Sequence, residues 1–372
     1  MLGIDVGGQT VKSGLYVVEG NELAKKAVWI DHAVTAKGVD DHACQIVDII
    51  EKASKLSKPM KGRLIGVGIA TPGRFGVDGI IKPGTNPNVG RFVREFDGIH
   101  LRGEYVRAMQ ARNPDLLAYP FNVKNDGNAM LAGMIKSIQA KERPDMFDQK
   151  GKILKPHCVT GNHVGLIGLG TGLGHAIIHV NSDTSYRFVT DGHASKLKVS
   201  VDAPDLRMVV EAGELMKAKT GKEELVICDD GRMRAEDLYR SPMVNAMAGV
   251  ETGEELDIEV NEQHRKAIEF AGKYLGRTMA LIHSGKNEDI EPANGWSEED
   301  KEQAAKTSIY LFGGGLGRSE LGLELIKLAD AELAKQEIEG IRMVQIPDTN
   351  VATHAAAIMA FDSLKMGIME AI

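Results

Sequence analysis

The sequence predicts an α/β protein of two lobes, and three observations lead to this prediction. The chain has 372 residues, more than the roughly 250–300 residues that one hydrophobic core usually organises. Apolar runs with a period of two residues alternate with helical patterns along the chain. A strand, a glycine-rich turn and a returning strand occur twice, as DVGGQTVKSGLYVV and as GLGTGLGHAIIHV. Each repeat heads one half of the chain, so we expect two lobes.

The first lobe is expected over residues 1–124. After Gly7 and Gly8 the apolar pattern keeps its period of two, which predicts a strand–turn–strand hairpin. A Rossmann turn would continue as a helix. Residues 74–98 are rich in Gly, Pro and Asn and predict a long loop. The other elements expected here are strands over 1–7, 11–18, 27–33, 63–70 and one ending at Val123, with helices near 40–57 and 101–111.

The second lobe is expected over residues 125–350, with the C-terminal helix 351–372 completing the first lobe. It begins with Asp126 ahead of the helical stretch NAMLAGMIKSIQAK. Residues 141–162 predict a polar connection and the charged residues 285–304 a solvated excursion. The other elements expected are the strands VGLIGLG and GLGHAIIHV, helices over much of 204–282, the strand SIYLFGGG, a helix at 318–335, a strand at 341–346 and a final helix at 351–366.

Composition excludes several classes of protein. The net charge of −7 argues against a nucleic-acid or anionic-membrane surface, because there is no basic excess to bind phosphate backbones. The three cysteines lie far apart and predict no disulfide framework, so a reducing cytoplasm fits best. No signal peptide or membrane span is predicted, because Asp5 and many glycines interrupt the apolar runs.

The glycine-rich turns have the chemistry of phosphate sites. Glycines bring backbone N–H groups close to an anion, because no Cβ stands in the way. Two such hairpins can bind one polyphosphate from opposite sides of a cleft. The later cluster FGGGLG at 312–317 can let a flat base approach the backbone. Ordinary hairpins with glycines at positive φ remain the alternative.

These residues together resemble the ROK family (repressor, open reading frame, kinase) of the sugar kinase, heat-shock cognate 70 and actin superfamily. The resemblance rests on the two hairpins, on KNDGNAMLAG, ATPGRFGVDG and TDGH, and on the late Gly-Gly-Gly turn. It implies a ribonuclease-H-like (actin-like ATPase) fold with a nucleotide and sugar cleft between the lobes. It also implies a cytoplasmic, homodimeric enzyme that uses ATP and Mg²⁺ to phosphorylate a hexose, as glucokinases and N-acetylhexosamine kinases do.

The resemblance also implies a role for individual residues. Asp126 would be the general base, and Asp5 would face the magnesium ion through water. The residues on the sugar side would be Gly73, Asn88 (or Asn86), Asn125, His193 and Glu211. The residues on the nucleotide side would be Asp5, Gly7, Gly8, Thr10, Gly170, Thr171, Gly172, Gly174, Gly314 and Gly315.

The chain departs from the family pattern at two points. Gln9 stands where the family has Thr, so either Gln9 or Thr10 would supply the phosphate donor. Thr190 replaces the first Glu of the Glu-x-Gly-His motif, and residues 194–210 lack the cysteines of the family's zinc site. We therefore expect the zinc site to be lost.

Plainer interpretations stay open for several of these residues. Asp126 taken alone is a good helix N-cap, and Glu211 at a helix start can be a solvated dipole partner. The string HCVTGNH at 157–163 predicts a surface loop rather than a metal site. His175 and His179 share one strand face through simple alternation.

Two other functions also stay open. The family includes sugar-sensing repressors, which carry a DNA-binding segment ahead of the first phosphate strand; here the first strand begins at once. Polyphosphate can replace ATP as the donor. Neither the identity of the sugar nor a role for the 141–162 and 285–304 segments follows from the residues.

Overall fold

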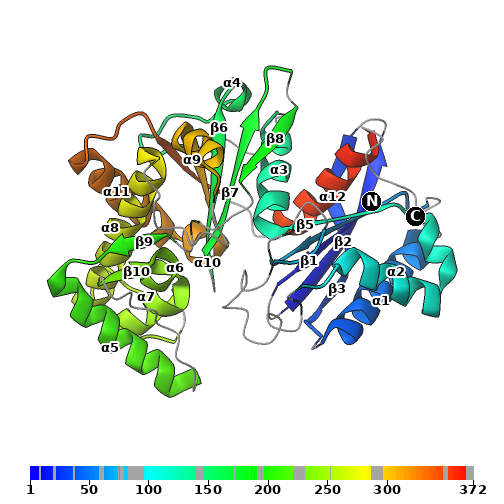
Figure 1. Ribbon diagram of the computed structural model, residues 1–372, viewed down its shortest axis with the longest axis horizontal. Helices are drawn as coiled ribbons and strands as arrows, with labels where there is room; N and C mark the ends of the chain where they lie inside the picture. Colours follow the sequence, from blue (N-terminus) through cyan, green and yellow to red (C-terminus); the bar gives the residue numbers. More distant parts are fainter. Residues whose placement is uncertain are drawn as a thin grey trace. The chain divides into compact units, whose positions relative to one another are not determined.

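The computed structural model of the chain (Figure 1) forms two compact units. One comprises Met1–Glu142 and Thr349–Ile372, the other Arg143–Asp348. The structure describes residues 1–7, 10–19, 22–36, 38–57, 63–73, 75, 79–82, 96, 98–139, 146–170, 173–183, 185–190, 194, 197–220, 231–251, 253–285, 296–346 and 351–365. No helix in these ranges is long and apolar enough to cross a membrane.

The first unit is built on a five-stranded sheet with the order β3-β2-β1-β4-β5. β1, β4 and β5 are parallel, whereas β2 and β3 return antiparallel to them. The predicted strand–turn–strand hairpin is therefore confirmed. The elements of this unit are β1 (Leu2–Val6), β2 (Thr10–Glu19), β3 (Glu22–Val34), α1 (Val39–Ser57), β4 (Val67–Thr71), α2 (Leu101–Arg112), the 3₁₀ helix η1 (Pro114–Ala118), β5 (Phe121–Asn125), α3 (Asp126–Gln139) and α12 (Val351–Lys365).

Helices cover both faces of this sheet. α1 and α2 pack on one face over a core that includes Leu2, Ile4 and Ile46. α12 crosses the other face, where Figure 1 shows it in red. Gly3 and Gly68 make that close approach possible, because a Cβ at either position would collide with a backbone carbonyl of α12.

The boundary between the units differs from the one expected at residues 124 and 125. α3 packs against α12, β4 and β5 and lies in the first unit, which continues to Glu142. The physical reason is the small-residue contact between α3 and α12: a Cβ at Gly133 would overlap Ala355. β5 also runs two residues beyond Val123, so α3 follows it with no intervening loop.

The second unit holds a five-stranded sheet with the order β12-β11-β6-β7-β8 and a two-stranded sheet of β9 and β10. β6, β11 and β12 are parallel, and β7 and β8 return antiparallel. The elements are α4 (Pro156–Val159), β6 (His163–Leu169), β7 (Leu173–Val180), β8 (Tyr186–Thr190), β9 (Lys198–Ser200), α5 (Ala203–Thr220), β10 (Arg232–Arg234), α6 (Ala235–Tyr239), α7 (Ser241–Ala248), η3 (Gly253–Glu255), α8 (Glu262–Ser284), α9 (Glu298–Ala305), β11 (Thr307–Gly313), α10 (Gly314–Arg318), α11 (Glu320–Lys335) and β12 (Arg342–Gln345).

One expectation for this unit is wrong, and one strand was not predicted. Residues 285–304 do not form one solvated excursion, because Trp296 is buried against the core and 298–305 form α9. Ser297 and Asp300 close a capping box that starts this helix. β8 was not expected either: its residues lack the alternation of a half-buried strand, and pairing with β7 forms it.

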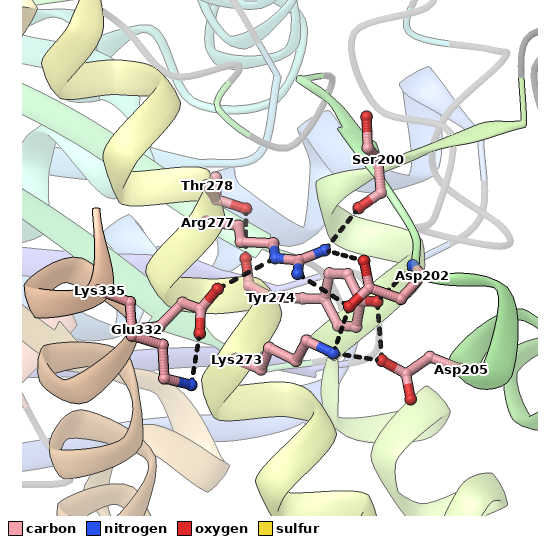
Figure 2. A network of polar contacts seen from close by, with 9 residues as sticks. All are labelled: Ser200, Asp202, Asp205, Lys273, Tyr274, Arg277, Thr278, Glu332 and Lys335. Atoms are coloured by element: carbon pink, nitrogen blue, oxygen red, sulfur yellow. Dashed lines mark hydrogen bonds and ion pairs between the residues drawn. The ribbon is translucent and has the colours of Figure 1, made fainter.

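A polar network ties α5, α8 and α11 together in the second unit (Figure 2). The Arg277 guanidinium donates to both carboxylate oxygens of Asp202 at 2.8 Å and to Glu332 at 3.1 Å. Lys273 Nζ lies 2.6 Å from Asp202 and 2.7 Å from Asp205. Hydrogen bonds from Arg277 and Lys273 lower the pKa of Asp202 to about 2.

We expect this network to lose strength in acid. Because the folded-state pKa of Asp202 lies below its ordinary value, its contribution is complete above about pH 4 and is lost as the pH falls toward 2. Urea unfolding of the parent and of Asp202→Asn should therefore show a stability difference at pH 6 that shrinks below pH 4. Glu262→Gln, which breaks an exposed pair with Lys266, is the control with little effect. A difference that stays constant from pH 6 to pH 3 would contradict this role.

Candidate active site

The carboxyl ends of three parallel strands bring the first group of candidate residues to one edge of the first sheet. Asp5 of β1 is in register with Ala70 of β4, which is in register with Lys124 of β5. Neighbouring strands lie about 4.8 Å apart, so the ends of β1 and β5 are about 10 Å apart. This edge therefore collects Asp5, Gly7, Gly73, Asn125 and Asp126.

One backbone hydrogen bond and one side-chain hydrogen bond hold the first glycine turn. The Gly7 N–H donates to the Thr10 carbonyl at 2.8 Å, and the Thr35 hydroxyl donates to the Gly7 carbonyl at 2.6 Å. These bonds fix Gly7, which follows the half-buried Asp5 by two residues. Gly8 and Gln9 lie outside the described residues.

Asp126 is the first residue of α3 and has a half-buried side chain. Its Oδ1 accepts a hydrogen bond from the Gly127 N–H at 2.7 Å. Burial nevertheless raises the pKa of Asp126 above its ordinary value, because desolvation disfavours the charged carboxylate. A carboxylate with a raised pKa in a strand-end position has the properties of a general base.

The cap of α3 is Asn125 rather than Asp126. Asn125 Oδ1 accepts from the Asn128 N–H at 3.2 Å, which is the bond of an N-cap residue to the third helical residue. Asn125 Nδ2 donates to the Gly73 carbonyl at 2.9 Å. The interpretation of Asp126 as a plain N-cap is therefore wrong, and Gly73, Asn125 and Asp126 lie together. Asn88 and Asn86 lie outside the described residues.

Lys12 is a residue of this edge that sequence reasoning missed. It lies on β2 directly opposite Asp5 of β1, and paired residues in a sheet project from the same face. Its side chain is half-buried, and within the described part of the chain its ammonium makes no ion pair or hydrogen bond. The sequence feature that could have identified Lys12 is its position in the returning strand, two residues after Thr10.

The second group of candidate residues lies at the carboxyl ends of β6 and β11 in the second unit. β6 and β7 form the predicted antiparallel hairpin, with Gly168 opposite Gly174. The Gly170 carbonyl accepts from the Ser241 N–H at 2.9 Å, which brings the start of α7 to this turn. Thr171 and Gly172 lie outside the described residues.

Gly314 packs against the end of β6, beside this turn, in a backbone conformation that favours glycine. Its φ is +82°, and an added Cβ would collide with the backbone of Leu169 at the end of β6. At Gly315, by contrast, an added Cβ would meet no described heavy atom within 4 Å. The backbone at Gly315 is therefore open to a flat group, while Gly314 holds the turn against β6.

Glu211 was expected at a helix start, but it lies within α5. α5 begins eight positions earlier, at Ala203, and the exposed Glu211 carboxylate pairs with Arg207 at 2.8 Å. Glu211 lines a surface cavity of about 480 Å³ with Met208 of the same helix and Met247 of α7. His193 lies outside the described residues.

The four histidines of the second unit that were considered from the sequence each lie on a helix or a strand. His157 and Cys158 lie on the one-turn helix α4 and His163 on β6, so the expected surface loop is wrong for them. His175 and His179 lie four residues apart on the continuous strand β7, which confirms the alternation expected for them. The His163 ring lies 4.5 Å from that of His179. Burial lowers the pKa of His175 to about 3. Within the described ranges no three His, Cys, Asp or Glu side chains form a metal-binding group.

No family model matches the chain. No curated protein matches it either. Solved structures do match over nearly the whole chain. The ROK hexokinase from Thermus thermophilus has 16% sequence identity and a TM-score of 0.57, and covers 98% of this chain and 99% of its own. The ROK glucokinase from Streptomyces griseus, solved in complex with glucose and AMPPNP, has 15% identity and a TM-score of 0.51, and covers 97% and 99%.

A regulator matches as well as these enzymes do. It is described as a ROK family transcriptional regulator, a homolog of the E. coli MLC protein. It has 15% identity and a TM-score of 0.61, and covers 99% of this chain and 79% of its own. The expected two-lobed α/β fold of the actin-like ATPase type is therefore confirmed, and it is the fold of the ROK sugar kinases and of a ROK regulator.

Proposed function

We propose that this protein is an ATP-dependent sugar kinase that phosphorylates a hexose, with Asp126 as its general base. The observation that carries the proposal is the carboxyl group of Asp126. It is half-buried, has a raised pKa, and lies at the same sheet edge as Asp5 and the Gly7 turn. Its side chain is also not needed to cap α3, because Asn125 does that.

The proposed step is a phosphoryl transfer to a sugar hydroxyl. Asp126 accepts the hydroxyl proton while the sugar oxygen bonds to the γ-phosphorus of ATP. The bond from that phosphorus to its bridging oxygen breaks, and ADP leaves with the electron pair. Positioning and charge stabilisation supply most of the rate in such reactions, and a general base adds about 10²–10⁴-fold.

The remaining edge residues suit a phosphate donor. The Lys12 ammonium can offset the negative charge that builds up on the transferring group. Magnesium would enter with ATP as part of the substrate, and the Asp5 carboxylate would face it through water, since Mg²⁺ usually keeps several of its water ligands. In the second unit, the open backbone at Gly315 suits adenosine. The glucose and AMPPNP in the Streptomyces griseus glucokinase support both substrates.

A sugar-sensing regulator without kinase activity is the second candidate function. The structural likeness to a ROK transcriptional regulator favours it. A regulator needs to bind sugar but needs no base with a raised pKa, so Asp126 favours the kinase. A kinase that uses polyphosphate would keep the same base and the same sugar residues.

A coupled assay of ADP release over a panel of hexoses separates these functions. With ATP and Mg²⁺ we expect turnover on at least one of glucose, fructose, allose, mannose and the N-acetylated hexosamines. A parallel assay with polyphosphate should detect sugar phosphate directly, since this donor yields no ADP. Sugar binding by calorimetry without turnover on either donor would favour the regulator and overturn the kinase proposal.

A further inference from the structure

The start of α7 supplies the second glycine turn with a hydrogen-bond donor. The first N–H groups of a helix have no partner within that helix. Ser241 is the first residue of α7, and its N–H donates to the Gly170 carbonyl at 2.9 Å. The Ser241 hydroxyl also reaches the Leu169 carbonyl, at the longer distance of 3.5 Å. The last residue of β6 and the first residue of the turn are therefore both tied to α7.

The corner between α6 and α7 is anchored in the core of the second unit. All five residues of α6 are buried, and Leu238 and Tyr239 belong to the hydrophobic core. The Asp237 carboxylate and the Arg240 guanidinium, each 3% exposed, form an ion pair at 3.8 Å. The Arg240 backbone is extended, with φ −63° and ψ 150°, and its carbonyl accepts two N–H groups of α7 at 3.0 and 3.1 Å. Because these contacts fix Arg240, they also fix the direction of the next N–H, that of Ser241.

We propose that this corner orients the second glycine turn for a phosphate group, with Ser241 as a positioning residue. In a trans peptide the carbonyl and the N–H point in opposite directions. Holding the Gly170 carbonyl against α7 therefore turns the N–H of the same peptide group away from α7, where it can donate to a phosphate oxygen. The assignment of that phosphate to ATP rests on the proposed kinase function, but the tie between α7 and the turn does not.

Two substitutions at one position separate the Ser241 N–H from its hydroxyl. Ser241→Pro has no N–H, and its ring carbon crowds the Gly170 carbonyl. Proline fits the first turn of a helix, and the extended Arg240 has the conformation that a residue before proline prefers. Ser241→Ala is the matched control, because it removes the hydroxyl and keeps the N–H.

Hydrogen exchange of the ligand-free protein tests the tie. In Ser241→Pro we expect faster exchange in peptides that cover the end of β6 and the start of β7, because the turn between them loses its support. In Ser241→Ala these peptides should exchange at the parental rate. Parental exchange in Ser241→Pro as well would overturn the proposal, since the turn would then hold its position without α7.

Calorimetry with two phosphate probes tests the orientation toward an anion. For Ser241→Pro we expect the Kd of Mg²⁺–AMPPNP and of Mg²⁺–tripolyphosphate to weaken at least about tenfold, because a hydrogen bond to a charged group is lost or misdirected. The Kd of the preferred hexose should change less than about threefold, and Ser241→Ala should bind all three ligands like the parent. Equal losses for sugar and both phosphate probes would reveal a merely structural role. A loss for AMPPNP alone would place the effect at the adenosine, and either result overturns the proposal.

The parental protein offers a test that needs no variant and holds even if Ser241→Pro fails to fold. By linkage, a tie that favours phosphate binding must itself be strengthened by bound phosphate. Exchange of the Ser241 amide should therefore slow when either phosphate probe is added and stay constant when hexose alone is added. An amide whose exchange ignores both probes, or a parent that binds neither, would contradict the inference. Binding of the probes without sugar phosphorylation would refute the proposed kinase and leave the tie in place.

Discussion

Asp126→Asn is expected to lower kcat at least about 100-fold, because the variant lacks the carboxylate that accepts the sugar proton. A base that acts only in the transition state contributes little to ground-state binding, so kcat and kcat/KM should fall together. Steady-state kinetics of ADP release measure both constants. Sugar affinity, measured by calorimetry, should stay close to the parental value.

The fold of Asp126→Asn should remain intact. The α3 cap is Asn125, which is unchanged. Because the folded-state pKa of Asp126 is raised, its ionised form costs stability at pH 7, and this cost declines as the pH falls through the raised pKa. The melting temperature at pH 7 should therefore equal or slightly exceed that of the parent. Asp115→Asn, at an exposed position on η1, is the matched control with parental activity. Parental kcat in Asp126→Asn would remove Asp126 from the mechanism.

The same pKa predicts how activity depends on pH. A general base must be deprotonated to act, so kcat should rise as the pH rises through the raised pKa of Asp126. The acid limb of the kcat profile should therefore lie above the range of an ordinary aspartate. Residual activity in Asp126→Asn should lack this limb.

Lys12→Met is expected to lower kcat/KM for ATP about 100-fold, equivalent to about 2.7 kcal/mol of transition-state stabilisation. Lys12 lies opposite Asp5 at the edge that holds the first glycine turn. Methionine keeps much of the apolar stem and removes the charge, so the loss reports on the ammonium. Lys12→Arg should recover part of the activity, because it restores the positive charge.

Lys55→Met, on α1, is the control for Lys12→Met, since Lys55 is exposed and pairs with Glu51 within its own helix. It should show parental kinetics. A lower melting temperature with unchanged kcat/KM in Lys12→Met would instead assign Lys12 a structural role beside Asp5.

Local patterns in the sequence were sufficient for much of the fold. A period of two after each glycine turn predicted both hairpins, and the structure has them as β1–β2 and β6–β7. The apolar helical period after Asp126 likewise predicted α3. These features depend on residues close together in the chain, whose alternation sets which side chains can share a face.

Non-local contacts decided the rest. α3 lies in the first unit because Gly133 has no Cβ and so lets α12 pack closely against it. α12 comes from the far end of the chain, so no local pattern predicts this contact. Lys12 is a candidate because strand register places it opposite Asp5. The hydrogen bonds of Asn125 to the Gly73 carbonyl and to the start of α3 likewise join segments that no local pattern brings together. Sequence determined which residues could serve the site; tertiary structure decided which of their atoms are free to do so, because register and helix packing depend on residues far apart in the chain.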